Sequence, residues 1–286
     1  MRVFMRNLLN KLGVALAGPL TDHLASKEEQ LVLYHAYRDM AARGVVPSFT
    51  DVGFRCYSQF EEDGILLFLF ALIGTTNKTA VEICAGDGSE CMSTNLILNH
   101  GWWGSLFDCN ARHVEKGRAF FQNKKDTFLY PPAFTRAWIT AENVNELITR
   151  SGITGDIDLL SLDIDGMDYW VWKAIDCIRP RVVVCETHNV IGAEDALTVP
   201  YDPHFVASTP DYHSASLAAM TKLAKEKGYR LVGTHRFGFN AFFVLDGIAP
   251  ALLPEVTPAR CLNDPYSRQT HSTRWPKVKD MNWVRV

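Results

Sequence analysis

The chain has 286 residues, 47% of them hydrophobic, and a formal net charge of −3 at pH 7. This size and apolar content suffice for one large core with extensions. The slightly acidic balance lacks the basic excess of a nucleic-acid-binding face, and no segment reaches the roughly 20 apolar residues of a membrane span. We therefore expect a protein that binds no nucleic acid and has no membrane span.

Seven cysteines are present, and no two of them form a CxxC pair. The odd number argues against a fully paired disulfide framework, and the spacing argues against a zinc ribbon or a thioredoxin-type site. Cys84, Cys109 and Cys185 lie in or beside apolar, strand-like runs, where a reduced cysteine behaves as a small hydrophobic residue. These features favour a reducing, cytoplasmic setting.

The N-terminal region reads as helical. Residues 1–20 faintly resemble a signal peptide, but Asn10 and Lys11 interrupt the apolar run and favour a short amphipathic helix. Residues 27–44 carry apolar side chains at helical spacing and end at a glycine. We expect these N-terminal helices to be the place where a homodimer contact would form.

The next predicted helix covers residues 58–74. Ser58 is a suitable N-cap, Glu61 completes a capping box, and Gly74 ends the helix. Strands and helices then alternate along the chain. The predicted strands are 79–84, 103–108, 133–139, 156–164 and 181–186, and the predicted helices are 93–101, 111–123, 141–152, 167–176 and 214–228.

Alternating strands and helices indicate a Rossmann-like, doubly wound α/β fold with a mostly parallel sheet. The last two predicted strands, 229–235 and 240–246, are joined by only a few residues around Gly238, which is too short for a parallel crossover. The predicted sheet is therefore seven-stranded and ends in an antiparallel hairpin, an arrangement similar to that of class I methyltransferases. We expect an N-terminal helical extension, a main domain and a C-terminal tail packed on it, at 1–57, 58–250 and 251–286.

The sequence VEICAGDGSE at residues 81–90 combines a strand with a glycine-rich turn that opens a helix. Gly86 and Gly88 permit tight turns and a close approach of a ligand to the backbone. The third glycine of a dinucleotide fingerprint is replaced by Cys91. Glu82 places an acid inside the strand, which disfavours a pyrophosphate and suits the cationic amino-acid end of S-adenosylmethionine.

The following strand ends in Asp108, 22 residues after Gly86, where an acid can bind the two ribose hydroxyls of an adenosine. Trp138 lies at the end of the third predicted strand, where an adenine would lie. A glycine turn alone also fits an ordinary tight joint between a strand and a helix. The turn and the two acids together favour S-adenosylmethionine as the cofactor.

Five blocks of the chain resemble, in order, those of FkbM-type methyltransferases: YSQFEEDGIL, VEICAGDG, GWWGSLFDCN, DLLSLDIDGMDYWVWKAI and RPRVVVCETH. The resemblance extends from about Tyr57 to Asp246. It implies a class I fold, S-adenosylmethionine as methyl donor, and usually O-methylation of sugars or natural products. Asp165 stands where the family commonly has a glutamate, and the first 56 residues lie outside the shared core.

The resemblance also assigns site residues. The cofactor residues that it and the glycine motif imply are Gln59, Glu62, Asp63, Glu82, Gly86, Gly88, Asp108, Trp138 and Asp163. Asp163 and Asp165 would lie at the carboxyl end of the fourth strand, with Glu186 and His188 at the end of the fifth. Those strands are neighbours in the methyltransferase order, and ligands bind beyond the carboxyl ends of such sheets.

Methyl transfer from a sulfonium mainly requires alignment of donor and acceptor, but a hydroxyl acceptor must also lose its proton to a base or to the influence of a metal. We predict His188 as the base, with Asp163 and Asp165 as further catalytic residues. Alternatively, Asp165, Glu186 and His188 would bind Mg²⁺ or Mn²⁺. In a third interpretation, Asp163 and Asp165 only cap the following helix and hold the loop.

The polar segment 187–213 is long for a joint in a compact domain, and such segments often bind substrates. We expect the acceptor, a sugar or another small molecule, to contact this region. The candidate acceptor residues are Tyr169, Tyr212, His213 and Asn240. The competing functions are a nicotinamide-dependent oxidoreductase, a non-methylating S-adenosylmethionine-binding protein, and a metal-dependent hydrolase.

Overall fold

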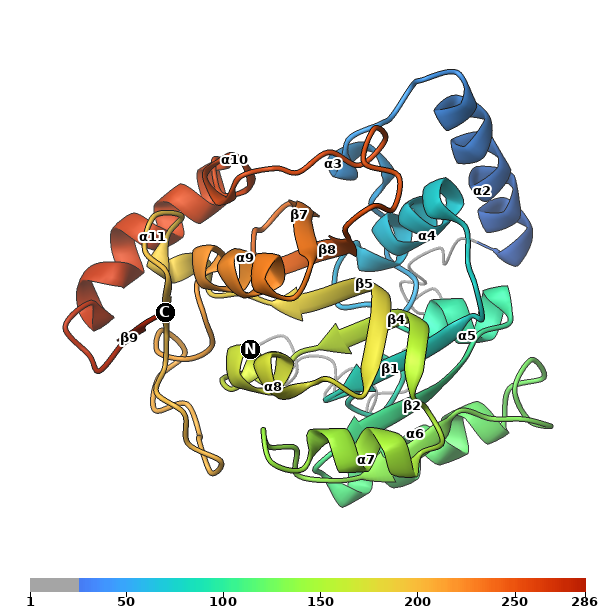
Figure 1. Cartoon of the computed structure of the whole chain (residues 1–286). Coiled ribbons are helices and arrows are strands. Elements are labelled where there is room, and N and C mark those ends of the chain that lie inside the picture. The colour runs from blue at the N-terminus through green and yellow to red at the C-terminus, as the bar shows by residue number, and fades with distance from the viewer. Residues whose placement is uncertain (1–25) are drawn as a thin grey trace, which may run out of the picture.

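The computed structural model describes residues 26–286, so the amphipathic helix predicted at 1–20 lies outside the described residues. A seven-stranded sheet in the order β3-β2-β1-β4-β5-β8-β7 runs through the molecule (Figure 1). Its strands are β1 (Thr79–Ile83), β2 (Trp103–Asp108), β3 (Ala133–Arg136), β4 (Gly155–Leu162), β5 (Ile178–Glu186), β7 (Tyr229–Thr234) and β8 (Asn240–Leu245).

Strands β1 to β5 are parallel, and β8 is antiparallel to both of its neighbours, β5 and β7. The predicted α/β fold with a closing antiparallel hairpin is therefore confirmed. The parallel strands β1, β2, β4 and β5 have their carboxyl ends at one edge of the sheet. Because β8 reverses direction between β5 and β7, the carboxyl end of β7 lies at the same edge. We call this edge the carboxyl edge.

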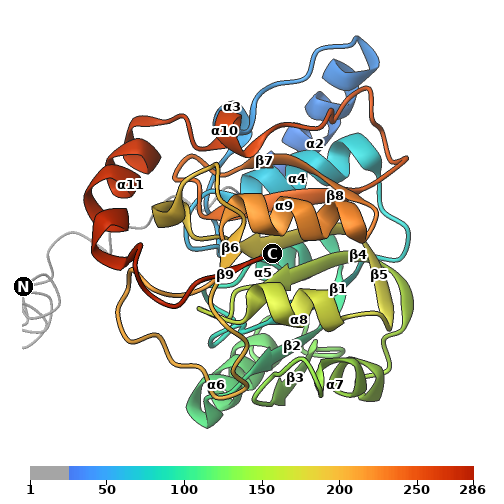
Figure 2. The same cartoon turned by 60° about the vertical axis from the view of Figure 1, so that its left-hand side comes forward.

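Helices cover both faces of the sheet (Figures 1 and 2). Side chains of α7, α8 and α9 form one hydrophobic core with the sheet, and those of α2, α4, α5 and α6 form the other. Val81 and Ile83 of β1 join the first core and Ala80 joins the second, as the alternation of a strand requires. The helices are α2 (Lys27–Ala42), α4 (Glu62–Ile73), α5 (Thr94–His100), α6 (Ala111–Gln122), α7 (Val144–Arg150), α8 (Asp168–Ala174) and α9 (Leu217–Glu226).

The start of α4 differs from the prediction, because the N-cap is Glu61 and not Ser58. The Ser58 hydroxyl accepts from the Asp63 amide at 3.1 Å, and one Asp63 oxygen accepts from the amides of Cys56, Tyr57 and Ser58 at 2.6–2.8 Å. These bonds hold the residues before the helix as a loop against its first turn. Ser58 thus serves that loop and does not begin the helix.

The C-terminal residues form elements that the sequence did not predict, namely α10 (Pro258–Cys261), α11 (Pro265–Val278) and β9 (Val284–Arg285). Strand β9 pairs with β6 (Leu197–Thr198), and Arg285 forms an ion pair with Asp195 at 2.8 Å. The tail therefore fastens the long segment that follows β5 (Figure 2). Within residues 26–286 there is no helix both long and apolar enough to cross a membrane.

The amino end of the sheet contains a buried ion pair. Asp158 of β4 is fully buried and accepts from the amides of residues 76–78 at 2.7–3.0 Å and from Arg181 at 3.0 Å. Arg181 also donates to the carbonyls of Ile73 and Gly74 at the end of α4. Burial alone would raise the pKa of Asp158, but these hydrogen bonds outweigh it and hold the pKa below its usual range.

We expect Asp158→Asn to lower the free energy of unfolding by about 3–5 kcal/mol, because it leaves Arg181 nearly buried without a counter-charge. The matched control is Asp156→Asn, which breaks the exposed pair with Arg179 and should cost about 0–1 kcal/mol. Urea denaturation of both variants measures the difference. Equal effects would contradict this account of the Asp158 network.

The same network sets a pH dependence. The folded pKa of Asp158 lies below its unfolded value of about 3.9, so its stabilisation is complete above that pH and is lost as the pH falls through the folded pKa. The difference in stability between wild type and Asp158→Asn should therefore shrink as the pH falls below about 4. A constant difference down to about pH 2 would contradict the assignment.

Candidate active site at the carboxyl edge

The glycine turn after β1 has the backbone that the sequence predicts. Cys84, Gly86 and Gly88 have φ values of 66°, 56° and 74°, in the left-handed region. A Cβ on Gly88 would lie 2.9 Å from the Phe121 ring of α6, whereas a Cβ on Gly86 would meet nothing closer than 3.9 Å. Helix packing therefore requires Gly88, while Gly86 leaves one side of the turn open to a ligand.

Glu82 holds this turn from inside the sheet. Its side chain is buried and accepts from the amides of Met92 and Ser93 at 2.7 and 2.8 Å, with further hydrogen bonds from the Ser93 hydroxyl and the Cys91 thiol. All of these partners belong to the segment between the turn and α5. Glu82 therefore acts on a ligand at the turn through the shape of this segment.

Asp108 connects the ends of β1 and β2. One carboxylate oxygen accepts from the Gly86 amide at 3.0 Å, and the other accepts from the Asn110 amide at 2.8 Å. The His113 Nδ1 lies 3.4 Å from the Asp108 carboxylate, and Asp108 is 7% exposed. A carboxylate has about four acceptor positions, so Asp108 retains acceptor capacity for ribose hydroxyls while it anchors the glycine turn.

The structure places the other predicted cofactor residues in different settings. Gln59 is exposed in the loop before α4. Asp63 is buried under that loop, and burial raises its pKa to about 6 although four hydrogen bonds oppose the shift. Trp138 is 48% exposed beyond the end of β3, and its indole donates to the Pro203 carbonyl at 2.7 Å. Trp138 thus links β3 to the long segment after β5.

A group of carboxylates follows β4 and β5, and we call it the carboxylate cluster: Asp163, Asp165, Asp168 and Glu186. Burial, then the charges of Asp168 and Asp165, raises the pKa of Asp163 well above its ordinary value. Burial and Asp163 do the same to the pKa of Glu186. Within the described part of the chain, no lysine or arginine forms an ion pair with the cluster. The basic side chain paired with the cluster there is His213, whose Nδ1 lies 3.9 Å from Glu186.

One member of the cluster, Asp168, accepts hydrogen bonds from backbone amides. Asp168 accepts from the amides of Ile164 and Gly166 at 2.8 and 3.2 Å and from the Ser214 hydroxyl at 3.1 Å. The loop-holding role that one interpretation gave to Asp163 and Asp165 is thus carried out by Asp168. The side chains of those two aspartates make no hydrogen bond to residues 26–286, which leaves their oxygens available.

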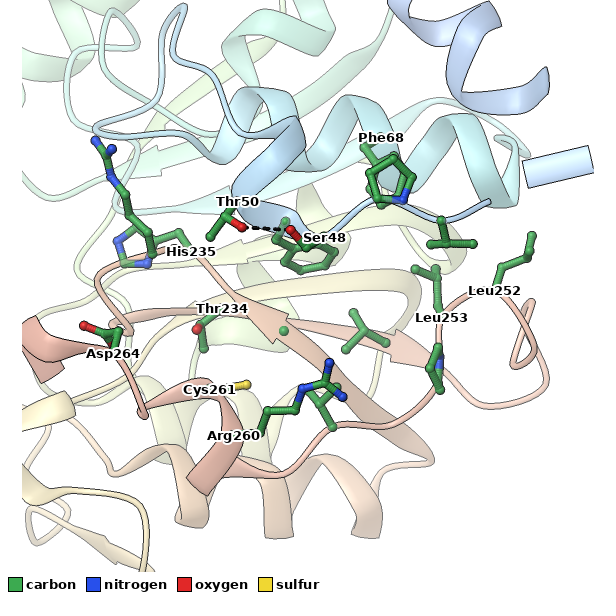
Figure 3. Close-up of a pocket in the computed structure, with 18 of the residues that line it drawn as sticks. Ser48, Thr50, Phe68, Thr234, His235, Leu252, Leu253, Arg260, Cys261 and Asp264 are labelled. Carbon is green, nitrogen blue, oxygen red and sulfur yellow. Dashed lines mark hydrogen bonds between the residues drawn. The ribbon is translucent and has the colours of Figure 1, made fainter. Parts of the chain in front are cut away.

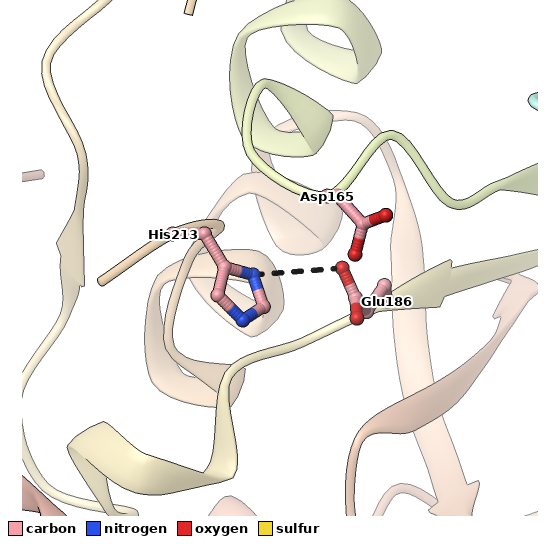
Figure 4. Close-up of side chains that lie close together, drawn as sticks. All are labelled: Asp165, Glu186 and His213. Atoms are coloured by element: carbon pink, nitrogen blue, oxygen red, sulfur yellow. Dashed lines mark ion pairs between the residues drawn. The ribbon is translucent and has the colours of Figure 1, made fainter. Parts of the chain in front are cut away.

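His213 reaches the cluster from the long segment after β5. Asp165, Glu186 and His213 each offer a ligand atom, and these atoms lie within 4.8 Å of one another (Figure 4). The His213 Nδ1 is 3.9 Å from Glu186 and 3.0 Å from the Ser214 hydroxyl. Burial lowers the pKa of His213, which favours the neutral imidazole that metal binding or proton acceptance requires.

The predicted histidine, His188, lies behind His213. Its ring lies tilted against that of His213 with centroids 4.1 Å apart, and its Nε2 is 2.9 Å from the Asp211 carbonyl. A carbonyl only accepts, so that nitrogen carries the proton and is not free to take one from a substrate. Burial, followed by the His213 charge, lowers the pKa of His188 to about 3. The structure therefore brings His213, and not His188, to the carboxylates.

Of the four predicted acceptor residues, His213 alone is among the carboxylates. Tyr169 falls on the inward face of α8 and is 3% exposed. The Tyr212 hydroxyl donates to the Asn282 carbonyl at 2.7 Å. The Asn240 amide donates to Glu62 at 2.8 Å and is 1% exposed. These three side chains are thus engaged within the protein.

The C-terminal tail supports His213, a role that the sequence did not reveal. Trp283 packs edge-on against Tyr212 with centroids 4.7 Å apart and lies 6.5 Å from the His188 ring. Arg274 of α11 forms an ion pair with Asp211. The segment that carries His213 is therefore held from outside by the tail. Trp275 and Trp283 are the residues of the tail that could have indicated this packing.

No protein-family model and no curated protein matches the chain. Solved structures that resemble it include S-adenosylmethionine-dependent methyltransferases. One, from Clostridium acetobutylicum, is 12% identical over 76% of this chain and 99% of that one, with a TM-score of 0.41. The glycopeptide N-methyltransferase MtfA with sinefungin is 12% identical over 74% and 98%, with a TM-score of 0.42. At this level of similarity the fold assignment depends on the strand order itself, and the FkbM resemblance stays a prediction.

Proposed function

We propose that the chain is an S-adenosylmethionine-dependent methyltransferase that methylates a hydroxyl group of a sugar or another small molecule. The observation that carries this proposal is the carboxylate cluster, which lies at the carboxyl edge without an ion pair to a lysine or arginine among residues 26–286. Like charges gathered close together disfavour one another, and a cationic ligand relieves that repulsion. The sulfonium and ammonium groups of S-adenosylmethionine are such cations.

The same charge argument separates the proposal from the nicotinamide-dependent oxidoreductase. A pyrophosphate would bring further negative charge to an edge that already carries Asp163, Asp165 and Glu186. The glycine turn also lacks the third glycine of the dinucleotide fingerprint. Both features disfavour NAD and favour a cationic adenosine-containing cofactor.

Three residues suit the cofactor. Gly86 lets it approach the open side of the turn, Asp108 retains acceptor capacity for ribose hydroxyls, and Asp163 has free oxygens for the cationic group. When bound, S-adenosylmethionine supplies a methyl group that is already activated. The chain then has to align an acceptor oxygen and remove its proton.

We assign proton removal to Asp165, Glu186 and His213. Two carboxylates and one imidazole suit a divalent cation such as Mn²⁺, and the free oxygens of Asp165 fit that role. Bound there, the metal would lower the pKa of an acceptor hydroxyl. Without a metal, His213 beside Glu186 is the base. The support for either form is the closeness of the three side chains.

Calorimetric titration with S-adenosylmethionine, S-adenosylhomocysteine and NAD tests the cofactor. We expect the two sulfur compounds to bind and NAD not to bind. Asp108→Ala should weaken their binding by about 10- to 100-fold, the equivalent of one charge-assisted hydrogen bond. The control Glu115→Ala, an exposed residue of α6, should leave it unchanged. Binding of NAD in place of the sulfur compounds would contradict the proposal.

The two glycines of the turn should separate binding from stability. Gly88→Ala should lower the free energy of unfolding by about 2–4 kcal/mol, because it combines a left-handed φ with a clash against Phe121. Gly86→Ala has the same φ penalty of about 1–2 kcal/mol without the clash, and should mainly weaken S-adenosylmethionine binding. The reverse pattern, found by denaturation and titration together, would contradict the open side at Gly86.

Histidine variants test the assignment of proton removal. His213→Ala should reduce Mn²⁺ affinity and methyl transfer by at least about tenfold, whereas the exposed control His204→Ala should change neither. S-adenosylmethionine binding should survive in both variants. If methyl transfer falls without any Mn²⁺ binding in the wild type, His213 is the base. Loss of function in His188→Ala with full function in His213→Ala would return the role to His188.

A further inference from the structure

A pocket of about 690 Å³ lies beside β7, the edge strand of the sheet, and Figure 3 shows residues that line it. Its walls come from residues 46–50, from residues 232–236 at the end of β7, and from residues 251–264. This volume is within the range of ordinary small-molecule sites, about 300–1,000 Å³. None of the residues assigned above to cofactor or proton transfer lines it.

The pocket is apolar at one end and polar at the other. Figure 3 shows Leu252, Leu253 and Phe68 toward one end, and Thr234, His235 and Asp264 toward the other. Phe49 and Val46 extend the apolar wall, and Val46 is 37% exposed. Figure 3 shows Arg260 between the two ends, so a ligand with a polar head at Arg260 and an apolar body toward Leu253 would match this lining.

The charges define the head group. Within residues 26–286, the Arg260 guanidinium lines the pocket without an ion pair or a hydrogen bond, whereas Arg236 is paired with Glu61 at 3.0 Å. Asp264 also lines the pocket, but one of its oxygens accepts from the Ser267 amide, the other is buried, and Figure 3 shows its carboxylate away from the Arg260 guanidinium. The guanidinium of Arg260 is therefore the charged group that a ligand in the pocket can reach.

A second pocket, of about 540 Å³ between α2, α4 and α5, lacks this feature. Its lysines are already engaged: Lys27 forms an ion pair with Asp126 at 3.4 Å, and Lys78 donates to the His100 carbonyl at 2.9 Å. Of these two pockets, the one beside β7 is therefore the one with a cation left to bind a ligand.

We propose that this pocket binds an amphipathic carboxylate, whose acidic head contacts Arg260 and whose hydrocarbon body lies against Phe49 and Leu253. Guanidinium–carboxylate bonds are charge-assisted, and often bidentate, so they discriminate an acid from its neutral amide. The hydrocarbon body contributes affinity through burial of apolar surface. A fatty acid and an arylalkanoic acid share this chemistry.

Calorimetric titration of the full chain tests the site. The probes are octanoate and 4-phenylbutyrate, their neutral amides, and acetate, which has the head without the body. We expect one or both long acids to bind at least about tenfold more tightly than the matching amide, and acetate not to bind. Octanoate alone would identify an aliphatic ligand, and 4-phenylbutyrate alone an aromatic one, and either result supports the site.

Two variants locate the ligand. Arg260→Gln should abolish the difference between acid and amide, and Val46→Asp should weaken both by placing a charge on the apolar wall. The matched control Arg112→Gln, an exposed arginine of α6, should bind as the wild type does. Thermal unfolding of each variant checks folding without reference to the methyltransferase proposal.

The proposal is overturned if neither long acid binds, if the amides bind as tightly as the acids, or if Arg260→Gln retains the preference for the acid. Binding of acetate as tight as that of octanoate would also overturn it, because the apolar wall would then contribute nothing. Failure of S-adenosylmethionine to bind would contradict the proposed function and leave this test unaffected.

Discussion

The carboxyl edge depends on how buried acids are satisfied where parallel strands end together. Glu82 and Asp108 accept backbone amides of the glycine turn, and Asp168 accepts those of the loop after β4. These bonds build the edge, because a buried carboxylate is tolerated only when it is hydrogen-bonded or paired. Asp163 and Asp165 lie beside them without such bonds, so their charge is available to a ligand.

The difference between acids that accept backbone amides and acids that do not explains how far the sequence could predict the site. Strand periodicity, the glycine turn and the acids at strand ends follow from local patterns, and the fold and the position of Asp108 were predicted from them. The spacing of Asp163, Asp165 and Asp168 does not indicate which of them takes up backbone amides. That depends on the path of the loop, in which Asp165 adopts a left-handed φ of 57°.

Which histidine lies beside the carboxylate cluster depends on tertiary contacts still more. His188 follows β5 directly and was the obvious candidate, but the chain turns its Nε2 toward the Asp211 carbonyl. His213 returns to the cluster only because the segment that carries it is held by Trp283 and Arg274, about 70 and 60 residues later. Such long-range contacts leave no periodic signal in the sequence. The pairing of β6 with β9, which also fastens this segment to the tail, leaves none either, since each strand contains only two residues.

The antiparallel strand β8 separates the two regions that we assign to ligands. Asn240, its first residue, pairs in register with Glu186 on one side, and its carbonyl accepts from the His235 amide on the other. The Asn240 side chain donates to Glu62, so Asn240 separates the two regions and does not contact a ligand. The same reversal that ends the parallel sheet therefore puts one strand between the acidic cluster and the pocket of Arg260.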